Sequence, residues 1–331
     1  MRDNFKSIVK SVARIIRNND RITRREIAEL LPVSIMTVGK AVDSLYELGI
    51  ITENIPHTPG TGRKAGLLSL SERYCVVIDV SMRNFTLDIF DISGKKIAAL
   101  THRYSDAVLF EENLYIFFDR VKAFCAEKTR DLNLIGVGMI VPGRYDPALD
   151  RVEFSGSMDF IGVNPSALLS EAFPGVPALV AESISMGAAW AAECFPQYKN
   201  VIYLKADLPL GAAVVTEGEV FRGAVEGIGV PTGADADKAY EYMPYIEKAR
   251  LISRAIVGYM TVFCPDAVIV ERSGGSADDG MTETIASLFT TEFFIKPERC
   301  PRIVRFSSEG AGKKNGILSK MFENWLDKTV K

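Results

Sequence analysis

The strand pattern of this chain occurs twice between residues 74 and 306, and this repetition limits the possible folds more than any other feature of the sequence. Each half opens with three short apolar segments separated by tight turns, after which helical and strand patterns alternate. The opening strands are predicted at 74–80, 85–90 and 96–100 in the first half, and at 201–205, 211–216 and 220–222 in the second. Such a repeat favours an internally duplicated α/β fold with two lobes, and such folds bind ligands in the cleft between the lobes.

Hydrophobic periodicity predicts the remaining elements of both halves. Helices are predicted at 110–129, 165–172, 185–194, 239–263, 282–288 and 310–327. Buried strands are predicted at 134–140, 178–181, 267–270 and 302–306. The segment between the strand at 134–140 and the helix at 165–172 is expected to be a loop.

The first seventy residues have a different pattern, with three predicted helices followed by a hairpin. The first helix is expected over 4–18. The second begins at Thr23, because Thr23 and Glu26 form a T-x-x-E capping box. The third opens at Ser34, a good N-cap residue. A short helix, a tight turn and a second helix with small polar residues at its start predict a helix-turn-helix.

The third helix has an apolar face that should pack inward and a polar face that should not. The apolar positions, which recur at helical spacing, are Val38, Ala41, Val42, Leu45 and Leu48. The opposite face carries Met36, Thr37 and Lys40. Side chains at the start of such a helix meet base edges in the major groove, where small hydroxyls and a lysine fit. We therefore predict DNA contacts from Ser34, Met36, Thr37 and Lys40.

A β-hairpin with a Gly- and Pro-rich tip is predicted after the third helix, with strands at 50–54 and 67–70. This hairpin would be the wing of a winged helix. Arg63 and Lys64 lie at the edge of its glycine loop, where they could reach phosphates or the minor groove. A small helical domain that binds a protein partner is the alternative interpretation of the head.

Charge and cysteine content agree with an intracellular, DNA-binding protein. Residues 1–73 hold 12 Lys and Arg against 8 Asp and Glu, a net charge of +4, and the remainder holds 27 against 34, a net charge of −7. A basic head on an acidic body fits a nucleic-acid module joined to another domain. The five scattered cysteines and two histidines predict neither disulfides nor a structural zinc site. Because no apolar run reaches about 18 residues and no signal peptide is evident, a cytoplasmic location is expected.

Four segments of the body resemble the ROK family (repressors, open reading frames and sugar kinases) of the actin-like ATPase superfamily. They are IDVSMRN at 78–84, IGVGMIVPGRYDP at 135–147, VPALVAESISMGAAWAAECF at 176–195 and NVIYLKADLPLGAAVVTEGEVFRGAVEGIGV at 200–230. The first and last are similar to the family's two phosphate loops, the second to its G-x-G-x-P-G-x-x-D segment, and the third to its E-N-D-A-N-A-A-A stretch. The hairpin ending TGRKAGLL at 61–68 matches as well, so the resemblance covers nearly the whole chain.

The resemblance implies a fold class and a domain organisation. It predicts an N-terminal winged helix-turn-helix at 1–70, followed by a bilobed actin-like ATPase body, a duplicated ribonuclease H-like α/β unit. The first lobe would span 71–186 and include the closing helix within 310–331, and the second lobe would span 187–309. The closing helix is expected to pack onto the first lobe. Family regulators are dimers or tetramers, and an operator with two-fold symmetry requires at least a dimer.

Several positions that carry catalysis in family kinases are replaced here. Ile184 stands where the kinases have the Asp that acts as general base, and it cannot accept a proton. The second phosphate loop reads Asp207-Leu208-Pro209 instead of Gly-Thr-Gly, and Asp repels phosphate while Pro lacks an N–H. Asp79 of the first loop remains and is predicted to be structural. The family's E-I-G-H segment reads GIGV at 227–230, and its Cys-rich zinc loop is missing. We therefore expect no kinase activity, no cofactor and no metal.

Family regulators commonly sense a sugar or sugar phosphate in the cleft. The polar candidates for such a ligand here are Asp159, Glu182, Ser183 and Glu226. Three hypotheses remain. The chain is a DNA-binding regulator that responds to a sugar-like effector, with repression the more frequent family mode. Alternatively, its body is only a ligand-independent oligomerisation scaffold. The third possibility is an enzyme such as a sugar kinase, or a protein-binding module.

Overall fold

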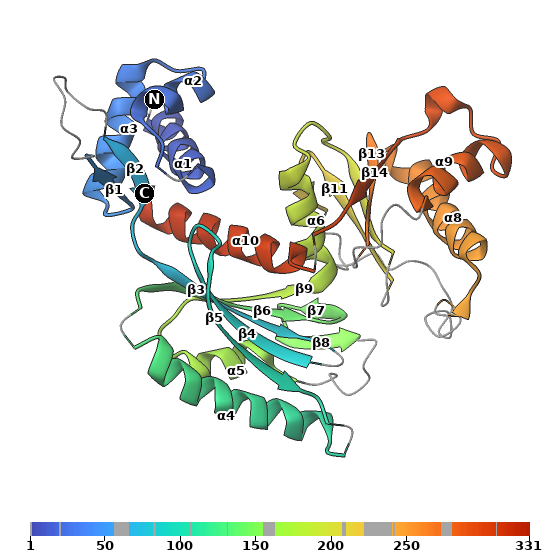
Figure 1. Cartoon of the computed structure of the whole chain (residues 1–331), viewed down its shortest axis with the longest axis horizontal. Helices are drawn as coiled ribbons and strands as arrows, with labels where there is room; N and C mark the ends of the chain where they lie inside the picture. Colours follow the sequence, from blue (N-terminus) through green and yellow to red (C-terminus); the bar gives the residue numbers. More distant parts are fainter. Residues whose placement is uncertain are drawn as a thin grey trace.

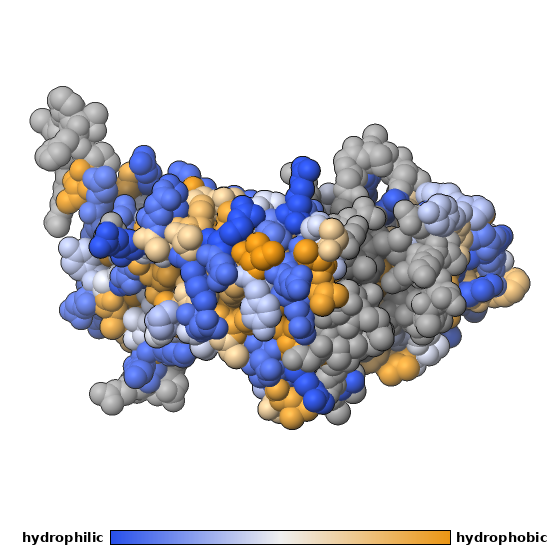
Figure 2. Space-filling view, turned by 90° about the horizontal axis from the view of Figure 1, so that it is seen from below, coloured by the Kyte–Doolittle hydropathy of each residue, from blue (hydrophilic) through white to orange (hydrophobic). Residues whose placement is uncertain are grey.

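The computed structural model describes the chain except for residues 1, 20, 56–65, 82–83, 106, 131, 155–162, 207–209, 222–239, 241, 273–279 and 309. The described residues form a small N-terminal head and a body with two five-stranded β-sheets, and one long C-terminal helix runs between the head and the first of these sheets (Figure 1). The face drawn in Figure 2 carries small groups of apolar side chains among hydrophilic ones. None of the described helices combines the length and apolarity that a bilayer crossing needs.

The head consists of three helices and a two-stranded antiparallel sheet. Its elements are α1 (Arg2–Asn18), α2 (Arg24–Leu30), α3 (Ile35–Glu47), β1 (Ile51–Asn54) and β2 (Leu67–Leu70). Both predicted caps are present. Thr23 Oγ1 accepts a hydrogen bond from Glu26 N at 3.3 Å, and Glu26 Oε2 accepts one from Thr23 N at 2.8 Å. Ser34 Oγ accepts a hydrogen bond from Thr37 N at 3.2 Å. Local capping chemistry therefore sets where α2 and α3 begin.

The apolar face of α3 is buried as predicted, with one exception. Val38, Ala41, Val42 and Leu45 are fully buried. Leu48, expected on the same face, is 39% exposed. It is the C-cap residue of α3 and keeps right-handed helical backbone angles, with φ −75° and ψ −3°.

The first lobe contains a five-stranded sheet in the order β5-β4-β3-β6-β9. Its strands are β3 (Tyr74–Val80), β4 (Asn84–Asp91), β5 (Lys96–Arg103), β6 (Leu134–Val141) and β9 (Ala178–Glu182). The hairpin pairs β3–β4 and β4–β5 are antiparallel, and β6 and β9 continue the sheet in parallel. Helices α4 (Phe110–Lys128) and α5 (Pro165–Ala172) cover one face, and α10 (Gly312–Thr329) covers the other (Figure 1).

The second lobe repeats this topology. Its strands are β10 (Val201–Lys205), β11 (Gly211–Thr216), β12 (Glu219–Val220), β13 (Ala267–Glu271) and β14 (Arg302–Phe306), in the order β12-β11-β10-β13-β14. An antiparallel hairpin again leads into parallel strands. Helices α8 (Tyr245–Phe263) and α9 (Met281–Thr291) cover one face and α6 (Ser183–Cys194) the other. The predicted duplicated α/β fold is confirmed.

Three predicted segments differ in the structure. The expected loop after β6 contains a hairpin of β7 (Arg144–Asp146) and β8 (Arg151–Phe154), which is too short to show a clear alternation. The helix predicted over 239–263 is interrupted: Tyr240 and Tyr242 are helical, Met243 and Pro244 are not, and α8 begins at Tyr245, because a proline disfavours helical geometry in the residue before it. Its predicted first residue, 239, lies outside the described residues. The closing helix begins at Gly312 instead of 310.

The closing helix α10 packs on the first lobe as expected, against β3, β6 and also α6. It contacts the head at its other end. Arg14 of α1 makes a two-pronged ion pair with Glu323, with both N–O distances 2.7 Å, and Lys10 pairs with Asp327 at 2.7 Å. One hydrophobic cluster runs from the head core through α10 to the first sheet. The head is therefore packed against the body as well as connected to it by the chain.

Candidate nucleic-acid interface and interlobe site

The predicted DNA-contacting residues of α3 lie together in its first two turns. Met36 is 71% exposed, so it does not fill the core, and Lys40 is exposed as well. The hydroxyls of Ser34 and Thr37 are 2.9 Å apart and bond each other, in addition to the cap that Ser34 makes. In this state the two hydroxyls are engaged within the chain, and Met36 and Lys40 extend outward.

One arginine bonds two carboxylates beside this face, so these three side chains together carry a net charge of −1. Arg24 of α2 bonds Asp43 Oδ1 of α3 at 2.9 Å and Glu53 Oε2 of β1 at 3.2 Å. Lys40 therefore stands on the face without an uncompensated carboxylate at Asp43. Sequence reasoning did not find Arg24, because its partners are 19 and 29 residues away and no local period relates them.

Four predicted site residues lie outside the described part of the chain. They are Arg63, Lys64, Asp159 and Glu226. The strands that carry the predicted wing are nevertheless described, with Asn54 opposite Leu67 at the end of the β1–β2 ladder.

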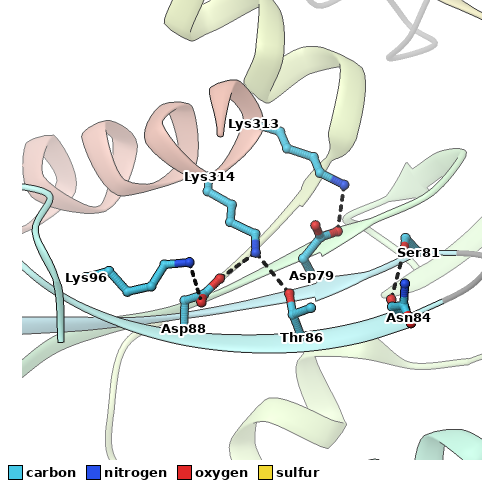
Figure 3. A network of polar contacts seen from close by, with 8 residues as sticks. All are labelled: Asp79, Ser81, Asn84, Thr86, Asp88, Lys96, Lys313 and Lys314. Carbon is cyan, nitrogen blue, oxygen red and sulfur yellow. Dashed lines mark hydrogen bonds and ion pairs between the residues drawn. The ribbon is translucent and has the colours of Figure 1, made fainter. Parts of the chain in front are cut away.

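A network of carboxylates and lysines joins the first turn of α10 to β3 and β4 (Figure 3). Asp79, which is only 8% exposed, forms an ion pair with Lys313, and its Oδ1 lies 2.8 Å from Lys313 Nζ. Asp88, 2% exposed, pairs with Lys314, which also bonds Thr86 Oγ1 at 3.0 Å. The carboxylate that the resemblance places in a phosphate loop thus has an ammonium group as its counter-ion. Within the described residues, no group of three or more His, Cys, Asp or Glu side chains is arranged to hold a metal ion.

Glu182, at the end of β9, is buried and hydrogen-bonded within the chain. Its Oε1 accepts a bond from Tyr145 N at 2.9 Å, and its Oε2 one from Ser185 Oγ at 3.3 Å. Burial raises the pKa of the Tyr145 hydroxyl to about 12, so this group stays protonated and donates to Asp150 Oδ1 at 2.7 Å. Because Tyr145 lies in β7, its N–H bond to Glu182 anchors the β7 hairpin to the end of β9. Ser183, the first residue of α6, is half-buried beside it.

Ile184 fills the position that the resemblance assigns to a catalytic base. Its side chain lies against Gly211, the first residue of β11, so closely that a Cβ at that glycine would collide with it. The position is therefore occupied by an apolar contact between α6 and the second sheet. Near the same connection, Glu271 at the end of β13 accepts hydrogen bonds from Tyr203 and Ser308. The two partners of Glu271 lie 68 and 37 residues away in the chain, so no local sequence pattern relates them to it.

Comparisons with known proteins bear on the whole chain. No family model matches. A xylose repressor of Caldicellulosiruptor bescii is 22% identical over 220 residues, which cover 64% of this chain and 54% of that protein. A putative xylose repressor of a second Caldicellulosiruptor strain is 23% identical, with the same coverage of both chains. The chain spans about half the length of these curated relatives.

Among solved structures, a ROK family transcriptional regulator described as a homologue of the E. coli MLC protein matches 98% of both chains, with a TM-score of 0.73 and 13% identity. A ROK family glucokinase of Streptomyces griseus, solved with glucose and AMPPNP, matches 76% of this chain and 98% of its own, with a TM-score of 0.55 and 16% identity. At these identities the structural likeness establishes the fold. The regulator shares the fold from end to end, and the kinase shares about three quarters of it.

Proposed function

Because the chain has the ROK fold and is similar over its whole length to a ROK transcriptional regulator, we propose that it is a DNA-binding regulator without kinase activity. The observation that carries this proposal is the exposed face of α3, which presents Met36 and Lys40 outward while the opposite face forms the head core. Repression is the proposed mode, since the curated relatives are named as xylose repressors. An operator-binding role implies a cytoplasmic location.

The proposed DNA contacts are shared between the recognition helix and the wing. Met36 and Lys40 would meet base edges, and the hydroxyls of Ser34 and Thr37 would exchange their mutual bond for phosphate or base contacts. Arg63 and Lys64 of the wing would bind phosphates. We assign residues 1–70 to the DNA-binding head, 71–186 with 310–331 to the first lobe, and 187–309 to the second.

Two internal contacts support the absence of phosphoryl transfer. The ion pair with Lys313 occupies Asp79, so a divalent cation would have to compete with an ammonium group for that carboxylate. Ile184 offers no proton acceptor and packs on Gly211. A kinase needs both a metal-bound nucleotide and a base or positioning group for the acceptor hydroxyl. An ATP-dependent phosphoryl-transfer assay with hexoses should therefore detect no product, and clear turnover would contradict this part of the proposal.

We propose that the interlobe region senses a sugar or sugar phosphate, and that Asp159, Ser183 and Glu226 belong to the binding residues. Support comes from the relatives named as xylose repressors and from the glucokinase structure solved with glucose. Glu182 is the weaker candidate, because both of its oxygens already accept bonds from the chain. The internal contacts of Glu182 and Asp79 also favour the second candidate function, a ROK body that serves only as an oligomerisation scaffold.

The proposed mechanism requires a homodimer or homotetramer. Two heads would bind half-sites about 34 Å apart, one turn of DNA, and a change in lobe closure would alter that spacing. A thermal-shift screen against sugars, amino sugars, sugar phosphates and ATP separates the two candidate functions. A ligand at 100 times its Kd adds about 2.7 kcal/mol of stability. A shift with a sugar supports the sensor, and no shift with any compound supports the scaffold.

DNA binding itself is tested by selecting sequences from a random duplex pool and measuring their affinity for Lys40→Ala. Loss of a groove lysine should weaken binding and reduce its salt dependence. The matched control is Lys122→Ala, which removes one positive charge from α4, outside the head. Equal affinity of Lys40→Ala and the unmodified protein for the selected DNA would contradict the proposed interface.

A further inference from the structure

Gly39 is one of two helical glycines, among the described residues, at which a Cβ would meet open space. A Cβ at Gly187 would collide with Tyr203, and a Cβ at Gly316 with the Met186 backbone, so contacts within the chain account for both. A Cβ at Gly39 would meet nothing within 4 Å. A glycine inside a helix costs about 1 kcal/mol relative to alanine. Nothing within the described protein compensates for that cost at Gly39.

The residues one turn before Gly39 are apolar and exposed. Ile35, four residues earlier, is 59% exposed, and Met36, three residues earlier, is 71% exposed. Positions three and four apart lie on one helical face, so Ile35, Met36 and Gly39 form a single surface beside Lys40. Gly258 of α8 is also open, but the residues one turn before it are the exposed Arg254 and the buried Ala255. The apolar pair is therefore particular to α3.

The surface has one exposed lysine beside it, which a polyanion such as DNA can contact. Lys40 is exposed next to Gly39, and the nearby Asp43 is paired with Arg24. The major groove of B-DNA admits an α-helix, and a residue without a side chain lets the helix backbone approach the base edges. None of the residues Ile35, Met36 and Gly39 has a side-chain group that could hydrogen-bond a base as Arg, Asn or Gln does. The one apolar group that bases present in the major groove is the C5-methyl of thymine, so that methyl is the group an apolar side chain can contact there.

Resting on the proposed function, we propose that Gly39 sets a close approach of α3 to the major groove and that Ile35 and Met36 read thymine methyl groups there. The operator half-site would then contain thymines whose methyl groups, and not only their base-pairing edges, determine affinity. Each methyl buried against an apolar side chain contributes about fourfold in affinity.

The test uses the full-length protein and two random duplex pools that are identical except that one contains uracil in place of thymine. We expect enrichment of specific sequences from the thymine pool, and a single thymine-to-uracil change in the selected site should weaken binding about fourfold. In the Met36→Ala variant, the same thymine-to-uracil change should cause no further loss of DNA affinity. Leu30→Ala, which truncates a 58% exposed apolar residue of α2, should keep the full uracil penalty. Equal enrichment from both pools would refute thymine reading while leaving DNA binding intact. No enrichment from either pool would refute the proposed function and this inference with it.

Gly39→Ala gives an independent test, because its two effects have opposite signs. The helix propensity of alanine should raise Tm by about 1 °C. The added methyl should weaken binding to the selected site about tenfold, comparable to one mismatched base pair. Gly258→Ala should raise Tm similarly and leave DNA affinity unchanged. Two results would refute a close approach of α3 to DNA at Gly39. One is a Gly39→Ala variant that binds the selected DNA as tightly as the unmodified protein, and the other is a Gly258→Ala variant whose DNA affinity falls by the same factor.

Discussion

Replacing Lys314 with methionine should lower the free energy of unfolding by about 3 kcal/mol, because it removes the main counter-ion of the buried Asp88 carboxylate. The side chain of Asp88 is 3% exposed, and that of Lys314 is 15% exposed. Removing one partner of a buried ion pair costs roughly 3–5 kcal/mol. Lys96 remains 3.0 Å from Asp88 but is 52% exposed, so it compensates only in part and the lower end of the range applies. For 331 residues, this loss corresponds to a decrease in Tm of about 4 °C.

Thermal and urea unfolding of three variants test this reasoning. Lys96→Met is the control, and its loss should stay below about 1 kcal/mol because the pair it breaks is half solvated. The double variant Lys314→Met with Asp88→Leu removes both buried charges and should recover most of the stability, since an apolar pair needs no counter-ion. The account of the buried network is refuted if Lys314→Met is no worse than Lys96→Met, or if the double variant is as unstable as the single one.

Three further predictions follow from the described contacts. Gly316→Ala should cost at least about 2 kcal/mol, because its Cβ would be driven into the Met186 backbone at the α6–α10 crossing; a neutral result in urea unfolding would show that the helices are not that close. Glu323→Arg should increase hydrogen exchange in α1 by breaking the ion pair to Arg14, and Arg14→Glu in the same chain should restore protection; failure of the swap would exclude that pair as the head contact. Burial raises the pKa of Cys75 to about 12 and that of Cys125 to about 11, so a thiol reagent at pH 8 should label the other three cysteines first, and rapid labelling of all five would contradict the packing.

Local patterns predicted the elements of this fold well where the relevant chemistry lies within one turn or one hairpin. The start of α2 follows from Thr23 and Glu26, and the start of α3 from Ser34, because a cap joins residues only three positions apart. The strands of both sheets follow from apolar runs and the turns between them. The errors lie at short or interrupted segments, such as the β7–β8 hairpin, which was expected to be a loop, and the break at Met243 and Pro244 before α8.

The candidate sites divide in the same way. The exposed face of α3 was predictable because burial of the opposite face is a matter of helical period. The counter-ion of Asp79 was not predictable, because Lys313 lies 234 residues later in the chain and no helical or strand period relates the two residues. The helical period also placed Met36 on the face opposite the apolar one, and its exposed fraction of 71% in the folded head agrees with that placement.

The sequence by itself determined the order of the main elements, the caps and the duplicated strand pattern. Each of these depends on residue type and short-range spacing, which the chain carries before it folds. Only the tertiary structure decided that α10 pairs with Asp79 and Asp88 at one end and with α1 at the other. Those contacts depend on how the two sheets and the head are placed, because a charge is stabilised by whichever opposite charge the completed packing brings near it.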